Sequence, residues 1–256
     1  MNFIVFAGTD IGTTKDTNQD SLSVKKLKTR LGNMTFAILC DGMGGLSSGE
    51  VASASVLYAF DKWLMNELPA LCRTGQITDA VIRSQWERII TEQNKRIAGY
   101  GRERDIRLGT TVVVMLLTKN RYYILNVGDS RAYEIGSTLT QITKDQTVVA
   151  REVEAGLLTW EQAETDSRRS ILLQCVGASE RVCPDMFFGE VKQDSVYMLC
   201  SDGFRHEITQ KEIYEKFQPE VLTDDFIMEK NINELIVLNK QRMERDNISV
   251  ILIRTF

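Results

Sequence analysis

Short apolar runs separated by polar turns alternate along this chain with longer stretches whose apolar positions recur at helical spacing. The short runs predict β-strands at residues 3–7, 36–40, 110–117, 122–127, 131–135, 139–142, 186–191, 196–200 and 248–253. Apolar side chains three and four positions apart predict one helix bearing Val56, Phe60 and Trp63 and another over residues 79–98. Helix-start signals stand at residues 47–50, 159–162, 209–212 and 223–225. A polar helical stretch over residues 146–163 is interrupted at Gly156.

The order of these elements predicts the fold class. Strands come first, followed by two helices, a group of closely spaced strands, further helices and a closing strand. A doubly wound parallel sheet would alternate strand and helix, so this order favours antiparallel sheets covered by helices. Because short connections join the strands from residue 110 to 142, we expect neighbours along the chain to pair antiparallel. With no Pro- or Ser-rich linker and no internal repeat, the chain is expected to form one domain over residues 1–256.

Composition is that of an ordinary globular protein. Of the 256 residues, 43% are hydrophobic and 26% are charged, and the net charge of -4 argues against sequence-independent nucleic-acid binding. The apolar runs are shorter than a membrane span, and the first residues do not resemble a signal peptide. The five cysteines are scattered, without a Cys-x-x-Cys pair. We therefore expect a cytoplasmic protein that binds neither nucleic acid nor membrane.

The only histidine, His206, limits the available chemistry. A zinc site built on several histidines cannot form within one chain, and any Ser-His-Asp machinery would need this residue. His206 could be a general acid or a metal ligand, but it lies between Arg205 and Glu207 without ligand spacing. We therefore favour its interpretation as a loop residue.

Acidic residues stand at the ends of several predicted strands. Asp41-Gly42 follows the run 36–40, and Asp202-Gly203 follows the run 196–201. Three further carboxylates are placed in a similar way, and they are Asp129, Asp246 and Asp20. Magnesium and manganese take carboxylate and carbonyl oxygens as ligands, and a following glycine lets a carbonyl turn toward a second ion. This pattern is compatible with one shared metal site.

The Asp-Gly dipeptide is also a leading hairpin-turn sequence. A hairpin needs a strand on each side, whereas both dipeptides are followed by a loop and a helix start. From the pattern alone, metal ligation and turn formation are about equally supported. The glycine-rich segment 42–45 could also cradle a phosphate, but it lacks the Lys-Ser or Lys-Thr of a nucleotide-phosphate loop.

Six motifs taken in order resemble those of the metal-dependent protein phosphatases of type 2C. In this chain they are Asn18-Gln19-Asp20, Asp41-Gly42-Met43-Gly44-Gly45, Gly109-Thr110-Thr111, Val127-Gly128-Asp129-Ser130-Arg131, Ser201-Asp202-Gly203 and Asp246-Asn247-Ile248-Ser249. The resemblance extends from about residue 9 to residue 253. Residues 139–145, followed by a helical insert, look like the bacterial branch of that family.

The resemblance implies an α+β fold of two stacked antiparallel β-sheets flanked by helices, with metals at one edge. It implies hydrolysis of phosphoserine and phosphothreonine by direct attack of a hydroxide that bridges two Mn²⁺ or Mg²⁺ ions. By position, Asp41 would bridge the two metals and Gly42 would lend its carbonyl. Asp202 and Asp246 would complete the shell of one metal, with Gly203 only forming the turn. The remaining two assignments are a water-mediated role for Asp20 and a third, weaker metal at Asp129.

Three departures from the family pattern are expected to matter. Lys15 stands where many members have an Arg that grips the substrate phosphate, so we expect weaker phosphate binding; the alternative is a solvated loop lysine. Met43 stands where eukaryotic members often have His, which leaves protonation of the leaving group to water or another group. Gln146 replaces a His found after Asp145 in many members, and residues 147–170 match the family's mobile flap.

The implied partners are phosphorylated proteins and a cognate Ser/Thr kinase. Two other functions are compatible with the scaffold: a non-catalytic module that binds phosphoproteins, and a phosphohydrolase for a small molecule. The complete set Asp41, Asp202 and Asp246 argues against the first. An assay that compares phosphopeptides with nucleotides would separate the second.

Overall fold

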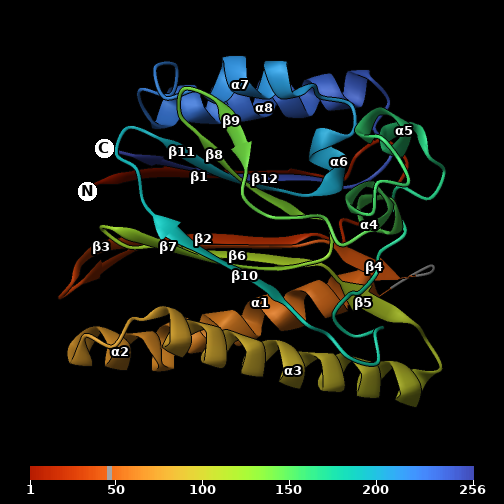
Figure 1. The fold of residues 1–256 in the computed structure, drawn as a ribbon, viewed down its shortest axis with the longest axis horizontal. Helices are drawn as coiled ribbons and strands as arrows, with labels where there is room; N and C mark the ends of the chain where they lie inside the picture. Colours follow the sequence, from red (N-terminus) through yellow and green to blue (C-terminus); the bar gives the residue numbers. More distant parts are fainter. Residues whose placement is uncertain (45–47) are drawn as a thin grey trace.

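The computed structural model describes residues 1–44 and 48–256. Within these ranges, two five-stranded antiparallel sheets are stacked between two layers of helices (Figure 1). This arrangement confirms the predicted α+β fold class. Gly45 of the glycine-rich motif and Ser47 of the first helix-start signal lie outside the described residues.

Each sheet is assembled from strands that are distant in the sequence. Sheet A has the order β1 (Phe3–Asp10), β12 (Ile248–Thr255), β11 (Val196–Cys200), β8 (Arg131–Ile135) and β9 (Leu139–Gln141). Sheet B has the order β10 (Asp185–Glu190), β7 (Arg121–Val127), β6 (Val112–Leu117), β3 (Gly32–Cys40) and β2 (Ser21–Thr29). A short ribbon pairs β4 (Gly42–Gly44) with β5 (Leu108–Thr110).

The helices form two outer layers and one cluster at an end of the sandwich. Sheet B is covered by α1 (Gly49–Asn66), α2 (Leu68–Thr74) and α3 (Asp79–Arg104), and sheet A by α7 (Gln210–Phe217) and α8 (Asp225–Gln241) (Figure 1). The short helices α4 (Val148–Glu154), α5 (Trp160–Thr165) and α6 (Asp202–Arg205) lie at the end that carries the β4–β5 ribbon (Figure 1). The chain termini lie at the opposite end.

Strand β3 shows how the core is built. Phe36 faces the helices and lies against the rings of Trp63 and Trp86, while Leu39 packs into the cluster between the two sheets. Both faces of the strand are buried, which explains why its sequence is continuously apolar rather than alternating. Full burial of each such side chain stabilises the fold by roughly 1.5–3 kcal/mol.

The predicted strand meander over residues 110–142 is divided between the two sheets. Strand β6 pairs with β7, and β8 with β9, as expected, but β7 belongs to sheet B and β8 to sheet A. The chain crosses between the sheets at Gly128, whose φ of +101° is rarely adopted by other residues. The expectation that β7 and β8 pair is therefore wrong, because their short connection is a crossover between layers.

Strand β2 and helix α2 are not predicted by the sequence pattern, and neither are β4 and α6, while one predicted helix is divided. Strand β2 is an edge strand with a partly exposed, lysine-containing sequence, so it carries no continuous apolar run. Helix α2 is a single short segment that directly continues α1. The helical stretch expected over residues 146–163 forms α4 and α5 on either side of Gly156, and Thr159 and Gln162 make the predicted capping box.

Candidate metal centre

The five predicted carboxylates are close enough to influence one another, and they centre on Asp41, which directly precedes β4. Strand β4 and helix α6, which Asp202 begins, lie at the same end of the sandwich (Figure 1). Asp41 follows β3, Asp202 follows β11, and Asp246 precedes β12. The other two come from the loops before β2 and after β7, and are Asp20 and Asp129. All four partners repel the charged form of Asp41, so residues from both sheets form one electrostatic cluster.

The backbone of Asp41 is fixed by two threonines at the end of β5, of which Thr110 is the last residue of the strand and Thr111 follows it. Its N–H donates to Thr111 Oγ1 at 3.1 Å, and its carbonyl accepts from Thr111 N at 2.8 Å and from Thr110 Oγ1 at 2.9 Å. Thr111 Oγ1 also lies 2.8 Å from Ser130 Oγ in the motif of Asp129. The Gly-Thr-Thr motif therefore ties Asp41 to the neighbouring crossover.

Gly42 permits a close approach of three backbone segments. A Cβ on this residue would lie 2.4 Å from the carbonyl oxygen of Gly49 and 2.5 Å from that of Gln19. Contacts this short are not tolerated by a real side chain. The glycine after Asp41 is therefore required where α1, β4 and the Asp20 loop meet.

Asp20 is held by its own loop and by the start of β12. Its N–H donates to Asn18 Oδ1 at 3.0 Å, and the preceding Gln19 N–H donates to Asn247 Oδ1 at 2.8 Å. Within the described part of the chain, neither buried carboxylate oxygen of Asp20 has a partner of normal hydrogen-bond geometry, although Ser249 and Ser201 lie near. A buried carboxylate left in this state costs free energy unless a cation or water satisfies it.

Asp202 begins helix α6 rather than a loop. The predicted role of Gly203 as a turn residue is wrong, because Gly203 lies inside the first turn of that helix. A Cβ there would lie 2.3 Å from the Asn247 carbonyl oxygen, so the glycine lets α6 touch the start of β12. Asp202 Oδ1 is buried and, among the described residues, has no hydrogen-bond partner.

His206 caps the C-terminal end of α6 and is not a solvated loop residue, which corrects the favoured interpretation. Its Nε2 lies 3.5 Å from Asp202 Oδ2, and its Nδ1 lies 3.5 Å from Glu244 Oε2. Burial lowers the pKa of His206, but the bond to Glu244 and the charge of Asp202 outweigh burial and raise it. The imidazole thus links a predicted metal ligand to the loop before β12.

Asp246 is the most exposed of the predicted ligands, with 39% of its side chain accessible. Its Oδ1 accepts from the Asn247 N–H at 2.8 Å and pairs with Lys15 Nζ at 2.9 Å. Its own N–H donates to Glu244 Oε1 at 2.8 Å. Lys15 also feels the charges of Asp41 and Asp202, which places its ammonium beside the cluster.

Burial and, to a lesser extent, mutual repulsion raise the pKa values of three of these carboxylates. Burial, followed by repulsion from Asp20 and Asp202, raises the pKa of Asp41 well above its ordinary value. Burial likewise raises the pKa of Asp20 to about 7, with added repulsion from Asp202 and Asp246. Burial and repulsion from Asp202 raise the pKa of Asp129 to about 7, against the attraction of Arg205.

The donor set fits divalent cations, although the side chains do not yet form a closed shell. In the described ranges, no three His, Cys, Asp or Glu side chains converge closely enough to enclose one ion. Positive charge would nevertheless stabilise the site, because the carboxylates repel one another. In addition, buried oxygens of Asp20 and Asp202 lack hydrogen-bond partners among the described residues. Hard cations complete such shells with waters and backbone carbonyls.

Sequence reasoning gave no role to Gln146, and the structure supplies one. Its backbone N–H donates to the Gly128 carbonyl at 3.0 Å, and its Oε1 accepts from the Gly128 N–H at 2.8 Å. Its Nε2 donates to Asp185 Oδ2 at 2.8 Å. Gln146 therefore fastens the crossover that carries Asp129 to strand β10, a role visible only once these segments are brought together.

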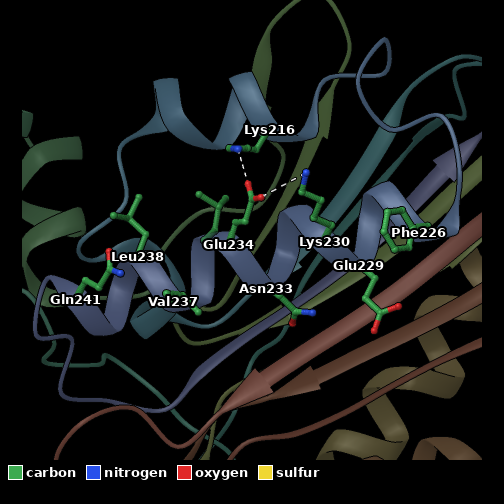
Figure 2. Close-up of a pocket in the computed structure, with 10 residues that line it drawn as sticks. Lys216, Phe226, Glu229, Lys230, Asn233, Glu234, Val237, Leu238 and Gln241 are labelled. Carbon is green, nitrogen blue, oxygen red and sulfur yellow. Dashed lines mark hydrogen bonds and ion pairs between the residues drawn. The ribbon is translucent and has the colours of Figure 1, made fainter.

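A pocket of about 720 Å³ lies away from these carboxylates. Figure 2 shows it along α8, with Phe226 near one end of that helix and Leu238 near the other, while Lys216 of α7 pairs with Glu234 between them. Its walls are made by these two helices and include none of the five carboxylates. Among the described residues, none of the helices combines the length and apolar character needed to span a membrane.

Comparisons with known proteins agree with this arrangement. Residues 7–226 match the family model of protein phosphatase 2C. The serine/threonine phosphatase stp of Listeria welshimeri is 31% identical over 249 residues, covering 96% of this chain and 93% of that protein. The crystal structure of serine/threonine phosphatase Stp1 from Staphylococcus aureus has a TM-score of 0.83 at 29% identity, covering 100% of this chain and 96% of that one. The catalytic domain of the phosphatase PstP, solved with two manganese ions, has a TM-score of 0.78 at 27% identity, covering 98% and 97%.

Stacked sheets with an acidic cluster at one edge, together with these matches, define a protein phosphatase. The chain belongs to the protein phosphatase 2C family. The predicted family and enzyme class, a phosphoprotein phosphatase, are confirmed. The relatives are bacterial serine/threonine phosphatases, in agreement with the predicted branch and function.

Proposed function

We propose that this chain hydrolyses phosphoserine and phosphothreonine in proteins at a two-metal site built on Asp41. The observation that carries the proposal is the buried carboxylate cluster, in which oxygens of Asp20 and Asp202 lack partners among the described residues. Cations stabilise the ionised form of such a cluster, and a pair of divalent cations is suited to phosphoryl transfer. The names of the bacterial relatives support the choice of substrate.

Asp41 is the proposed bridging ligand because it interacts with all four other carboxylates. Gly42 would add its carbonyl, and Asp202 and Asp246 would complete the shell of one ion. The two manganese ions of the PstP relative support the ion count, and magnesium fits the same oxygen ligands. When bound, two such ions lower the pKa of water and neutralise charge on the phosphate.

The remaining residues orient water and phosphate. Asp20, with two buried and unpartnered carboxylate oxygens in the described chain, is placed to order water beside Asp41. Lys15 keeps a half-exposed ammonium next to Asp246 and can turn toward a phosphate that enters from solvent. As a single point charge, it would hold that phosphate less specifically than a guanidinium fork.

Residues 147–170 are proposed as a flap at the edge of the substrate groove, within a single phosphatase domain over residues 1–256. They comprise α4 and α5, which lie at the same end of the sandwich as α6 (Figure 1). Arg168 connects the two helices, because its Nη2 lies 2.8 Å from Glu152 Oε2 in α4 and 2.8 Å from Oδ2 of Asp166, which directly follows α5. The flap also exposes Leu157 and Trp160, which a peptide substrate can contact.

The enzyme is proposed to act in the cytoplasm, opposite a cognate Ser/Thr kinase. All five cysteines are free thiols, and four of them are buried, as expected in a reducing compartment. Hydrolysis of phosphoproteins requires a kinase that supplies them. The third metal expected at Asp129 is left out of this proposal because Arg205 pairs with that carboxylate.

The direct test is hydrolysis of a phosphothreonine peptide, a phosphotyrosine peptide and a nucleotide with manganese or with chelator. The proposal predicts manganese-dependent release of phosphate, fastest from phosphothreonine. Equal activity in chelator would refute the metal site. Preference for the nucleotide would identify a small-molecule phosphohydrolase, and no hydrolysis of any substrate would favour a binding module.

A further inference from the structure

Arg205, the last residue of α6, places a buried guanidinium against Asp129. Its side chain is 14% exposed, and Nη2 donates to the Asp129 backbone carbonyl at 3.1 Å. The same nitrogen lies 3.6 Å from Asp129 Oδ2 and 3.6 Å from Asp145 Oδ2. Arg205 therefore contacts both the backbone and the carboxylate of the residue expected to hold a third metal.

A second arginine, Arg131, holds the Asp145 carboxylate that lies beside the Arg205 guanidinium. Arg131 binds Asp145 through two parallel bonds, of 2.8 Å from Nε and 2.7 Å from Nη2. Asp145 thus stands between Arg131 and Arg205, and its side chain is 11% exposed. A guanidinium does not lose its proton in proteins, so the charge of Arg205 is permanent.

Arg205 also acts on Asp202, the predicted metal ligand at the start of the same helix. It attracts the charged form of Asp202 as well as that of Asp129. Asp129 and Asp202 therefore share the permanent positive charge of one guanidinium that the protein itself supplies.

We propose that the Arg205 guanidinium takes the place of a third metal ion at Asp129, so that this chain binds two divalent ions only. An ion coordinated by Asp129 would lie within about 2.6 Å of its oxygen, close to a positive charge that cannot be neutralised. Arg205 would also have to abandon the Asp129 carbonyl and Asp145 while remaining buried. The residues around Asp129 therefore do not fit a third metal.

This inference rests on the proposed two-metal site. It assigns a role to Arg205, which carries no motif in the sequence. Asp129 becomes a positioning residue, which anchors α6 and therefore Asp202 through Arg205. The permanent charge also implies that activity rises with manganese in a single phase, because no weaker ion has to bind afterwards.

The test is the number of Mn²⁺ ions bound per chain, measured by calorimetric titration of the metal-free 256-residue chain and its variants. We expect two ions for the wild type and two for Asp129→Asn, with dissociation constants within about threefold of each other. Arg205→Gln, which keeps the size and removes the charge, should bind a third, weaker ion. Arg88→Gln, which removes an exposed arginine paired with Glu67 on the outer layer, is the matched control and should bind two.

Three results would overturn the inference: a third ion in the wild type, an ion lost in Asp129→Asn, or only two ions in a folded Arg205→Gln. If Arg205→Gln does not fold, the wild type and Asp129→Asn still decide between two and three ions. Absence of any manganese binding would refute the proposed function together with this inference. A third ion in an active, manganese-dependent wild-type enzyme would refute this inference alone.

Discussion

Asp41-Gly42 and Asp202-Gly203 are the same dipeptide at the end of a buried strand, yet their surroundings differ. The backbone of Asp41 is hydrogen-bonded to neutral groups of Thr110 and Thr111, and four other carboxylates repel its charged form. Asp202 is also buried, but the charges of His206 and Arg205 outweigh burial and lower its pKa. Burial and carboxylates therefore dominate the surroundings of Asp41, whereas cationic side chains dominate those of Asp202.

This difference indicates which of the two carboxylates would depend on bound metal ions for charge compensation. In the proposed site, external cations act at Asp41, whereas Arg205 of the chain itself supplies positive charge to Asp202. The two glycines differ less, because each permits a close backbone approach: Gly42 to Gly49 and Gly203 to Asn247. Sequence similarity thus predicts the packing of the two sites better than their electrostatics.

The largest expected effect comes from Asp41→Asn. Removal of the bridging charge should abolish metal-dependent hydrolysis, with a loss of several kcal/mol, or roughly 10³-fold or more in kcat/KM. Manganese affinity should fall in the same variant. Asp61→Asn, which removes a carboxylate of α1 paired with Lys25, is the control and should keep full activity. Full activity in Asp41→Asn would contradict the assignment.

Gly42→Ala and Gly203→Ala should both destabilise the fold by about 1–3 kcal/mol, because each new Cβ would overlap a carbonyl oxygen of another segment. For a domain of this size, roughly 2–4 °C in Tm accompanies each kcal/mol. The control is Gly99→Ala in α3, where the nearest atom is Arg102 Nη2 at 3.9 Å. That change should stabilise the helix by up to about 1 kcal/mol. Equal Tm values for all three variants would refute the packing argument.

The metal-free protein should lose stability as pH rises. The folded state raises the pKa of Asp20 and Asp129 to about 7, so it binds protons more tightly than the unfolded chain. The stability linked to these protons is complete below about pH 4 and is lost as pH rises through about 7. In chelator, we therefore expect Tm to fall by several degrees between pH 5 and pH 8.

Two further curves sharpen the pH experiment. Saturating manganese should remove most of the decrease, because the ions compensate the ionised carboxylates. Asp20→Asn in chelator should flatten the curve, since one of the titrating groups is gone. A Tm that stays constant or rises with pH in chelator would show that the cluster is not under electrostatic strain.

The smallest expected effect concerns Lys15. Replacement by Ala should raise KM for a phosphopeptide roughly tenfold, the equivalent of about 1.4 kcal/mol, with a smaller change in kcat. Lys15→Arg should lower KM below the wild-type value because the guanidinium can bind two phosphate oxygens. If KM is the same in wild type and Lys15→Ala, the residue is only a solvated loop lysine.

Much of the fold follows from local patterns in the sequence. The apolar runs of β3 and β11 predict buried strands, and the helical stripe with Trp86, Ile90 and Ile97 predicts α3, whose stripe is buried. Strand β2 does not follow, because an edge strand needs no continuous apolar run. The crossover at Gly128 does not follow either, since a short connection suits a hairpin equally well.

The site was only partly predictable. The family motifs identify Asp41, Asp202 and Asp246, but Arg205 and His206 carry no local signal. Their partners lie far away in the sequence. Arg205 bonds to Asp129, which is 76 residues away, and His206 contacts Glu244 in the loop before β12. Such pairs become visible only when the strands of both sheets end at the same edge.

The most direct measurement of the central claim is anomalous diffraction from a crystal soaked in manganese. The account predicts two peaks, each within about 2.5 Å of a carboxylate oxygen of Asp41, with one also next to Asp202 and Asp246. Asp129 should contact Arg205, and no manganese peak should lie next to Asp129. A single peak, or two peaks away from Asp41, would contradict the bridging role on which the proposed function depends.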